Sequence, residues 1–328
     1  MKKTLITGGA GLIGFNLITY LLAETDDQLV VVDNFSRGRK DREFEELIAT
    51  DRVTFHNADL CDQESFKKFG SGYDYIYHLA AVNGTDNFYK KPAEVLRINT
   101  LATLYLLEWM RETRSKAKLL FTATCESYAG GLEAFNQLPI PTPENVSLVV
   151  SDPMNERWSY AGSKIVNELF VINYARAYGF QTLVIRPHNF YGPRDFGEHV
   201  IPDFMERVKN KVDPFLIRGA DNTRSFLFIT DGVRAMRGLM KHEQTEPVEI
   251  VNIGSNEEIT MQELAEILFK AVGWKPKKLE ITNAPKGSTK RRQGDSSKLM
   301  SMIDWKPLVS IEQGLRQTYQ WYAAYSQK

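Results

Sequence analysis

Tyr160 and Lys164 are the residues of this sequence whose types and spacing best suit acid–base chemistry. They stand four positions apart, at the start of a segment in which apolar residues recur at steps of three and four as far as Tyr178. That pattern predicts a helix, on which positions i and i+4 share one face. A free tyrosine titrates near ~10, and a nearby ammonium group lowers that pKa toward a useful range. Because the same spacing arises by accident in many helices, the pair needs support from the rest of the chain.

A glycine-rich turn near the N-terminus indicates a dinucleotide site. Residues 4–7 have the composition of a short buried strand, and an amphipathic helix is predicted to end near Ala23. Between the two stand Gly8, Gly11 and Gly14. Glycines at this spacing let a pyrophosphate approach the backbone at the N-terminus of a helix.

The residue that ends the second predicted strand indicates which dinucleotide binds. Residues 29–32 form a buried apolar run that ends at Asp33. A carboxylate at this point can hydrogen-bond a ribose diol and repels a 2′-phosphate, which favours NAD over NADP. Arg37, Arg39 and Lys40 lie close by in the sequence and could attract a 2′-phosphate instead. We expect NAD.

Strands and helices alternate along the first 186 residues. Further strands are predicted at residues 53–56, 73–81, 118–123 and 181–186, and a long helix from Pro92 to about Glu112. Such alternation is typical of a doubly wound parallel sheet, in which ligands collect at the carboxyl ends of the strands. Thr124 and Glu126 come directly after the fifth strand, so we expect them at the same edge of the sheet as the glycine turn. We assign residues 1–187 to an NAD-binding Rossmann domain.

The second half of the chain is less regular and predicts a smaller, partly interleaved substrate lobe over residues 188–328. Helices are expected near residues 201–210, 231–241, 261–272 and 311–325, and short strands near 214–217, 226–229, 248–252 and 279–281. Parts of 225–255 are expected to join the Rossmann domain. Cationic residues of this lobe are either simply solvated or placed to bind a diphosphate: Arg224, Lys290, Arg291 and Arg292.

The composition excludes several other classes of protein. The 328-residue chain has 41 basic and 41 acidic residues, and a net charge of zero indicates neither a nucleic-acid nor a membrane partner. Its two cysteines, Cys61 and Cys125, have no metal-ligand spacing and indicate no disulfide framework. No apolar run is long enough to span a membrane, and the N-terminus does not resemble a signal peptide. We expect a cytoplasmic protein without a metal.

Several short motifs occur together from Thr4 to about Pro307. They are Thr7–Gly14, Asp33 with Asn34, Asp59 with Leu60, His78–Ala81, Asn99, Tyr160 with Lys164, Arg186–Pro193, Thr223–Phe226, Asn252–Gly254 and Arg292–Asp295. In this combination the chain resembles the extended short-chain dehydrogenase/reductase superfamily. Within it, the chain is most similar to the branch of nucleotide-sugar epimerases, dehydratases and decarboxylases. The resemblance implies NAD as cofactor and a nucleotide-diphosphate sugar as substrate.

The resemblance also implies a role for each reactive residue. Tyr160 would take the proton of the sugar 4-hydroxyl, Lys164 would hold the nicotinamide ribose, and Thr124 would share the hydroxyl's hydrogen bond. The cofactor would contact residues from every motif of the first half: Gly8, Gly11, Leu12, Ile13, Gly14, Asp33, Asn34, Asp59, Leu60, Leu79, Ala80, Ala81, Asn99, Tyr160, Lys164 and Pro187. The substrate would contact Thr85 in the sugar pocket, and its diphosphate Asn189, Arg224 and Arg292.

The residues after Thr124 bear on the fate of the sugar once its 4-position has been oxidised. Epimerases return the hydride to the other face and need no further acid. The 4,6-dehydratases place Asp and Glu there. Decarboxylases place Ser and Glu, and some carry an Arg-Trp pair before the tyrosine, as Arg157 and Trp158 stand here. This chain has Cys125 and Glu126, and a thiol is a poor match for a carboxylic acid that delivers a proton, which counts against a dehydratase.

We therefore interpret the chain as a 4-epimerase, with Cys125 and Glu126 as additional catalytic candidates. A decarboxylase, a 4,6-dehydratase and a 4-dehydrogenase are the alternatives. A non-catalytic NAD-binding sensor is a second alternative, although it would have no need of the intact Thr124, Tyr160 and Lys164. The helix from Pro92 and the helix with Tyr160 both have more apolar surface than one sheet face covers. We expect them to form a four-helix homodimer interface, as in the family.

Overall fold

A parallel sheet of seven strands forms the centre of the computed structural model, which describes residues 1–135, 138–197, 199–284 and 288–325. The strand order is β11-β6-β5-β4-β1-β2-β3. This is the doubly wound Rossmann-type arrangement that the alternating pattern predicts. The strands are β1 Lys3–Thr7, β2 Gln28–Asp33, β3 Val53–Asn57, β4 Tyr75–His78, β5 Lys118–Thr122, β6 Thr182–Pro187 and β11 Val248–Ile253.

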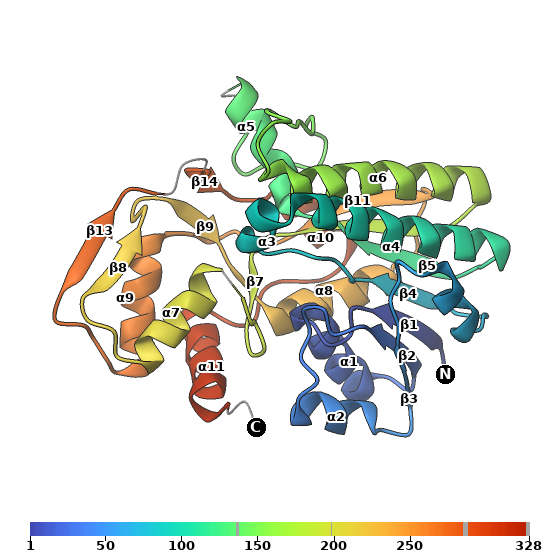
Figure 1. Ribbon diagram of the computed structural model, residues 1–328, viewed down its shortest axis with the longest axis horizontal. Helices are drawn as coiled ribbons and strands as arrows, with labels where there is room; N and C mark the ends of the chain where they lie inside the picture. Colours follow the sequence, from blue (N-terminus) through green and yellow to red (C-terminus); the bar gives the residue numbers. More distant parts are fainter. Residues whose placement is uncertain (136–137, 198, 285–287, 326–328) are drawn as a thin grey trace.

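Helices cover both faces of this sheet because its strands are apolar on both sides. On one face, α4 (Pro92–Glu112) and α6 (Trp158–Tyr178) lie side by side, and on the other lie α1 (Leu12–Glu24) and α8 (Ile229–Lys241) (Figure 1). Neighbouring residues of β1 show the division, since Leu5 packs in the core under α4 and Ile6 in the core under α1. Burial on both faces is what a continuous apolar strand requires.

The seventh strand of the sheet comes from the second half of the chain. β11 pairs in parallel with β6, from Val248 opposite Thr182 to Ile253 opposite Pro187. α8, which precedes β11, packs against α1 and β6, and α10 (Ser297–Met302) packs against β11. The chain therefore returns to the first half's sheet after it has begun the second lobe.

The smaller lobe has a core of its own, built around Phe215, Leu264 and Leu315. Three small sheets, with strand orders β13-β8, β12-β9-β14 and β10-β7, lie beside three helices (Figure 1). The helices are α7 Val200–Lys209, α9 Met261–Val272 and α11 Ile311–Ala324. The strands are β7 Phe190–Tyr191, β8 Phe215–Arg218, β9 Thr223–Ser225, β10 Leu227–Phe228, β12 Glu258–Thr260, β13 Leu279–Thr282 and β14 Arg291–Arg292.

Several short helices complete the fold. They are α2 Arg42–Ile48, α3 Thr85–Lys90, α5 Ala129–Phe135, and the 3₁₀ turns η1 Gln63–Lys68 and η2 Cys125–Tyr128. The side chain that caps η1 belongs to Asp62, and it accepts from the backbone N–H of Glu64. Among the described residues, no helix has the length and apolar character needed to cross a membrane.

Candidate active site

Tyr160 and Thr124 meet where η2 packs against the first turn of α6. Tyr160 is buried, and it forms a hydrogen bond with the side chain of Thr124. Lys164, one turn further along α6, is also buried, and its Nζ donates to the carbonyl oxygen of Thr122 at 2.7 Å. All three predicted residues line one cavity of about 1230 Å³.

Burial sets the charge state of the tyrosine and the lysine. It raises the pKa of Tyr160 above the ordinary ~10, and the hydrogen bond with Thr124 only partly offsets this. Burial also lowers the pKa of Lys164 to about 7, against the opposing effect of Glu168. The expectation that the ammonium lowers the pKa of Tyr160 is therefore wrong for the protein by itself, because desolvation is the larger effect. The phenol of Tyr160 holds its proton at neutral pH.

An aromatic ring that the sequence did not point to covers the tyrosine. Phe88, on α3, stacks on Tyr160 with ring centroids 4.9 Å apart and planes inclined by 10°. Thr85, at the start of the same helix, lines the cavity as well. Phe88 thus contributes to the desolvation that raises the pKa of Tyr160.

The glycine turn cannot hold a side chain at Gly8 or Gly14. A Cβ atom on Gly8 would lie 2.7 Å from the backbone nitrogen of Ala80, and one on Gly14 would lie 2.1 Å from the carbonyl oxygen of Gly8. At Gly11, the N-cap of α1, the nearest atom would be 3.5 Å away, and no side chain caps the helix. The free N–H groups of a helix N-terminus attract a phosphate.

Asp33 fixes the turn from the end of β2. Its carboxylate accepts hydrogen bonds from the backbone N–H of Ala10 at 2.9 Å and of Phe35 at 2.7 Å. Burial raises its pKa, and these two bonds partly offset the effect. Asp33 and the glycines line the cavity that also contains Tyr160. The residues present therefore fit NAD, which Asp33 and the glycine turn would hold in the cavity that also contains Tyr160.

Most of the other predicted cofactor contacts line the same cavity: Leu12, Ile13, Asn34, Asp59, Leu60, Leu79, Ala80, Ala81 and Pro187. Asn99 does not. Its side chain is buried, accepts from the backbone N–H of Val82 at 2.7 Å, and donates to the carbonyl oxygen of Val82 and the hydroxyl of Ser163. Asn99 therefore positions the segment after β4 against α6.

Glu126 lies in the cavity beside Thr124 and is bound by arginine. Arg292 donates to its two carboxylate oxygens at 2.5 and 3.1 Å, and the guanidinium of Arg157 lies 3.8 Å away. These guanidinium groups keep the pKa of Glu126 below its usual value, although burial opposes them. Arg292 was expected at the substrate diphosphate, and in this structure its guanidinium is engaged by Glu126. The sequence did not indicate this ion pair, which joins positions 166 residues apart.

The other predicted residues of this part of the chain, Cys125, Asn189 and Arg224, also line the cavity. Burial raises the pKa of the Cys125 thiol, so the side chain stays protonated at neutral pH. Asn189 has a φ of 43° and donates to the carbonyl oxygen of Ser225 at 2.7 Å. Arg224 lines the cavity and donates to the carbonyl oxygen of Thr223, and burial lowers its pKa to about 10.

His78, at the end of β4, has a structural role. His78 is buried between the hydroxyls of Thr7 and Thr103, at 2.8 and 3.1 Å, and burial lowers its pKa to about 3. His78 is therefore a packed histidine that joins β1, β4 and α4. Within the described ranges, no group of His, Cys, Asp and Glu residues has the arrangement of a metal site.

Comparison with known proteins identifies the family. The model of the NAD dependent epimerase/dehydratase family matches residues 4–254. The chain belongs to this family. It is 31% identical to the UDP-N-acetyl-alpha-D-glucosaminuronate decarboxylase of Bacillus cytotoxicus, over 98% of both chains. NAD is the cofactor.

Two solved structures extend the comparison to other reactions of the family. The UDP-glucose 4-epimerase of Thermotoga maritima, solved with UDP-glucose, superposes with a TM-score of 0.83 at 27% identity over 98% of both chains. A dTDP-glucose 4,6-dehydratase from Streptomyces venezuelae, solved with NAD, gives a TM-score of 0.85 at 26% identity, over 98% of this chain and 96% of that one. The relatives are thus a decarboxylase, an epimerase and a dehydratase.

Proposed function

We propose that this protein oxidises the 4-hydroxyl group of a nucleotide-diphosphate sugar and then acts as a 4-epimerase. The observation that carries the proposal is the convergence of Thr124, Tyr160 and Lys164 on the cavity that the glycine turn also lines. NAD, when bound, supplies the hydride acceptor. The protein's own residues orient the sugar and handle the proton of its 4-hydroxyl.

Tyr160 is the group in reach of that proton, and Thr124 is the group that orients the hydroxyl. The hydrogen bond between the two side chains defines a point where a third hydroxyl can join both. Lys164 supplies the cation that favours loss of the phenolic proton once the site is charged and closed to water. Its bond to the Thr122 carbonyl holds that cation in place.

Support for epimerisation comes from what surrounds the sugar end. Cys125 remains a thiol, so it is a poor proton donor for the loss of a hydroxyl group. Glu126 is held by Arg292, which makes it a weaker base than a free carboxylate. Dehydration needs both an acid and a base after oxidation, whereas epimerisation needs neither.

The second candidate is decarboxylation of a sugar that carries a carboxylate. The observation in its favour is the pair of guanidinium groups at Glu126, from Arg157 and Arg292. Such a pair can also hold the carboxylate of a uronic acid. The decarboxylase that is 31% identical over 98% of the chain supports the same candidate.

The test is incubation with UDP-, GDP-, dTDP- and CDP-linked sugars, including uronic acids, with products analysed by mass and NMR. An epimer of unchanged mass is the expected product. Loss of carbon dioxide establishes the second candidate, and loss of water contradicts both. Bound NAD without turnover of any sugar identifies a sensor instead of an enzyme.

We also propose that the protein is a homodimer. Leu96 on α4 and Val166 and Leu169 on α6 are 44%, 42% and 57% exposed, although both helices pack on the sheet with their other sides. A two-fold axis that pairs α4 and α6 with their copies covers these side chains.

A further inference from the structure

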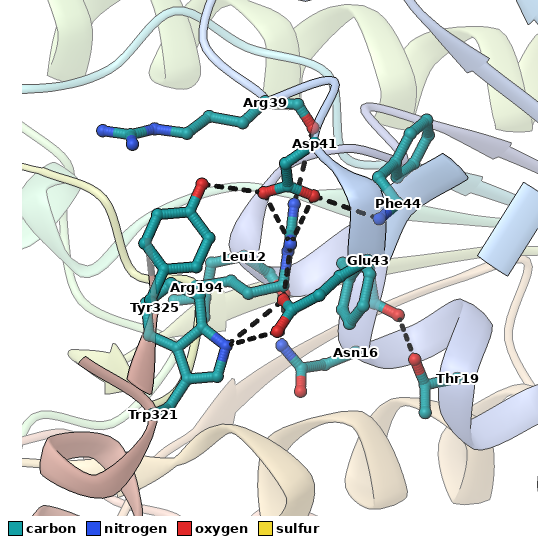
Figure 2. Close-up of polar contacts among 11 residues, drawn as sticks. Leu12, Asn16, Thr19, Arg39, Asp41, Glu43, Phe44, Arg194, Trp321 and Tyr325 are labelled. Carbon is teal, nitrogen blue, oxygen red and sulfur yellow. Dashed lines mark hydrogen bonds and ion pairs between the residues drawn. The ribbon is translucent and has the colours of Figure 1, made fainter. Parts of the chain in front are cut away.

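Arg194 joins the smaller lobe to the wall of the cofactor site through buried ion pairs. It lies just after β7, has a φ of 70°, and its side chain is 1% exposed. Its Nη1 donates to both carboxylate oxygens of Asp41, at 2.8 and 2.9 Å, and to Glu43 at 2.8 Å (Figure 2). Its guanidinium also lies over the ring of Phe15, 4.1 Å from the centroid.

Two residues at the end of the chain complete the cluster. The indole Nε1 of Trp321 donates to Glu43 at 3.0 Å, and the phenol of Tyr325 donates to Asp41 at 3.0 Å (Figure 2). The rings of Trp321 and Tyr325 stack on each other with centroids 4.5 Å apart. We call Arg194, Asp41, Glu43, Trp321 and Tyr325 the clamp. It brings together three segments from the start, middle and end of the chain.

The clamp fixes one end of a loop that borders the NAD site. Residues 34–41 begin directly after Asp33, whose carboxylate holds the N–H of Phe35, and they end at Asp41. In between, a Cβ atom on Gly38 would lie 2.5 Å from the Cβ of Ala10, so the loop lies against the glycine turn. The loop is therefore fixed at both ends while its middle borders the cofactor.

The part of the clamp that belongs to the smaller lobe, around Arg194, borders the same cavity. Arg194 and Phe196 line it together with Ser36, Arg37 and Gly38 of the loop. The guanidinium of Arg39 lies 3.8 Å from the ring centroid of Phe196. This is a second contact between the loop of residues 34–41 and the segment that contains Arg194. A dinucleotide in this part of the cavity would lie between the glycine turn and the two segments that the clamp holds together.

We propose that Arg194 is a positioning residue that controls the exchange of NAD, because it holds the loop of residues 34–41 closed. All the clamp's bonds are between protein groups, so they contribute to the closed form with and without cofactor. Weakening them raises the rate constants for NAD binding and release together and changes the dissociation constant little. A residue that contacts NAD directly behaves differently, because its loss speeds release alone.

The test uses the full-length protein loaded with NADH. Release is measured by the loss of NADH fluorescence after mixing with excess NAD, and the dissociation constant is measured by titration, which together give the association rate. Arg194→Lys keeps a positive charge, but its shorter side chain places no nitrogen where Nη1 meets Asp41 and Glu43, and it loses the Nη2 bond to the carbonyl oxygen of Arg39. Charge-assisted hydrogen bonds of this strength correspond to an increase of at least about tenfold in both rates.

A second buried ion pair, at the amino ends of the strands, provides a matched control. Arg237 and Asp27 form another buried ion pair, 3.3 Å apart with side chains 6% and 5% exposed, and the guanidinium of Arg237 lies over the ring of Tyr75. Asp27 precedes β2 and Tyr75 begins β4, so this pair lies at the amino ends of the strands, away from the cofactor. Arg237→Lys should lower the melting temperature and leave both NADH rates unchanged.

Glu43→Gln provides a milder variant in case Arg194→Lys does not fold. Its side chain is 42% exposed, and the amide oxygen can still accept from Trp321. Faster binding and release in these variants, with a dissociation constant within about threefold of the wild type, supports the clamp. Unchanged rates in folded variants overturn it. Faster release with an unchanged binding rate also overturns it, because Arg194 would then be a direct cofactor ligand.

Discussion

Glu126 accepts two hydrogen bonds from the guanidinium of Arg292, at 2.5 and 3.1 Å, beside the threonine that would orient the substrate. The pair places a carboxylate in the cavity that Thr124 and Tyr160 also line, and the guanidinium group keeps the pKa of that carboxylate below its usual value. Its role separates the possible reactions of the 4-keto intermediate. A base at this position is required for dehydration and is not required for epimerisation.

Glu126→Gln tests that role directly. For an epimerase we expect normal formation and normal decay of NADH absorbance, with an effect on the order of 1 kcal/mol from the altered hydrogen bonds to Arg292. The measurement is a rapid-mixing trace with the true substrate. Normal formation and then a stalled intermediate, with decay ~100-fold slower, would assign Glu126 to a second step and contradict the epimerase proposal.

Tyr160→Phe removes the proposed base while it keeps the ring under Phe88. We expect the variant to fold and to bind NAD, and to lose hydride transfer by at least ~100-fold, the usual effect of a general base. Single-turnover NADH formation gives the rate, and NADH fluorescence titration is the control for cofactor binding. Turnover at the wild-type rate would exclude Tyr160 from the chemistry.

Phe88→Ala should lower the pKa of Tyr160. Burial is the main cause that raises this pKa, and removing a ring stacked at 4.9 Å admits water, which stabilises the phenolate. The pH at which activity rises should therefore move down. The chain has 14 tyrosines, so the phenolate absorbance of the double variant Phe88→Ala/Tyr160→Phe is subtracted from that of Phe88→Ala. The difference is the absorbance of Tyr160. Phe88→Leu, which keeps an apolar cover, should shift the pKa less, and an equal shift in both variants would contradict the explanation.

Asp33 should make the protein bind NAD much more strongly than NADP, because its carboxylate repels a 2′-phosphate. Asp33→Asn removes that charge but keeps an oxygen that can accept from Ala10 or Phe35, so the ratio of the two dissociation constants should fall. Fluorescence titration with NADH and NADPH measures the ratio. Equal or tighter NADPH binding by the wild type would show that Arg37 or Arg39 determines the preference.

The proposed dimer can be tested by charge at the exposed faces of α4 and α6. Leu169→Glu should yield a monomer, because it places a carboxylate in an apolar interface. Ile281→Glu is the control, since Ile281 on β13 is 58% exposed and lies on the other lobe. Light scattering at micromolar concentration gives the mass of each variant. A wild type that is already monomeric disproves the interface.

The fold was predictable because its signals are local. The glycine turn, the apolar strands and the helix from Pro92 can each be recognised within a short window, and their alternation determines the sheet. The short helices α2 and α3 were missed because they are two turns long or less. Seven residues include too few apolar positions to show a helical period. The ends of such short helices are set by tertiary contacts, such as that of Asp41 with Arg194.

The site was predictable only where the position of a residue follows from a strand or helix next to it in the sequence. Thr124, Tyr160 and Lys164 could be placed from their positions relative to predicted strands and helices. The pairing of Glu126 with Arg292 and the stacking of Phe88 on Tyr160 depend on how distant segments pack. No local sequence pattern indicates these contacts. The direction of the pKa of Tyr160 was misjudged for the same reason, because desolvation is a property of the packed cavity.

The position of β11 has a consequence for synthesis of the chain. β6 pairs with β5 on one side and with β11 on the other, and β11 is made about 60 residues after β6 ends. Until the ribosome has released Val248–Ile253, the edge of β6 has unpaired backbone groups within an apolar strand. Such an edge can pair with another chain. A truncated product that ends near residue 187 should therefore aggregate, and slow translation between the two strands should reduce the yield of native protein.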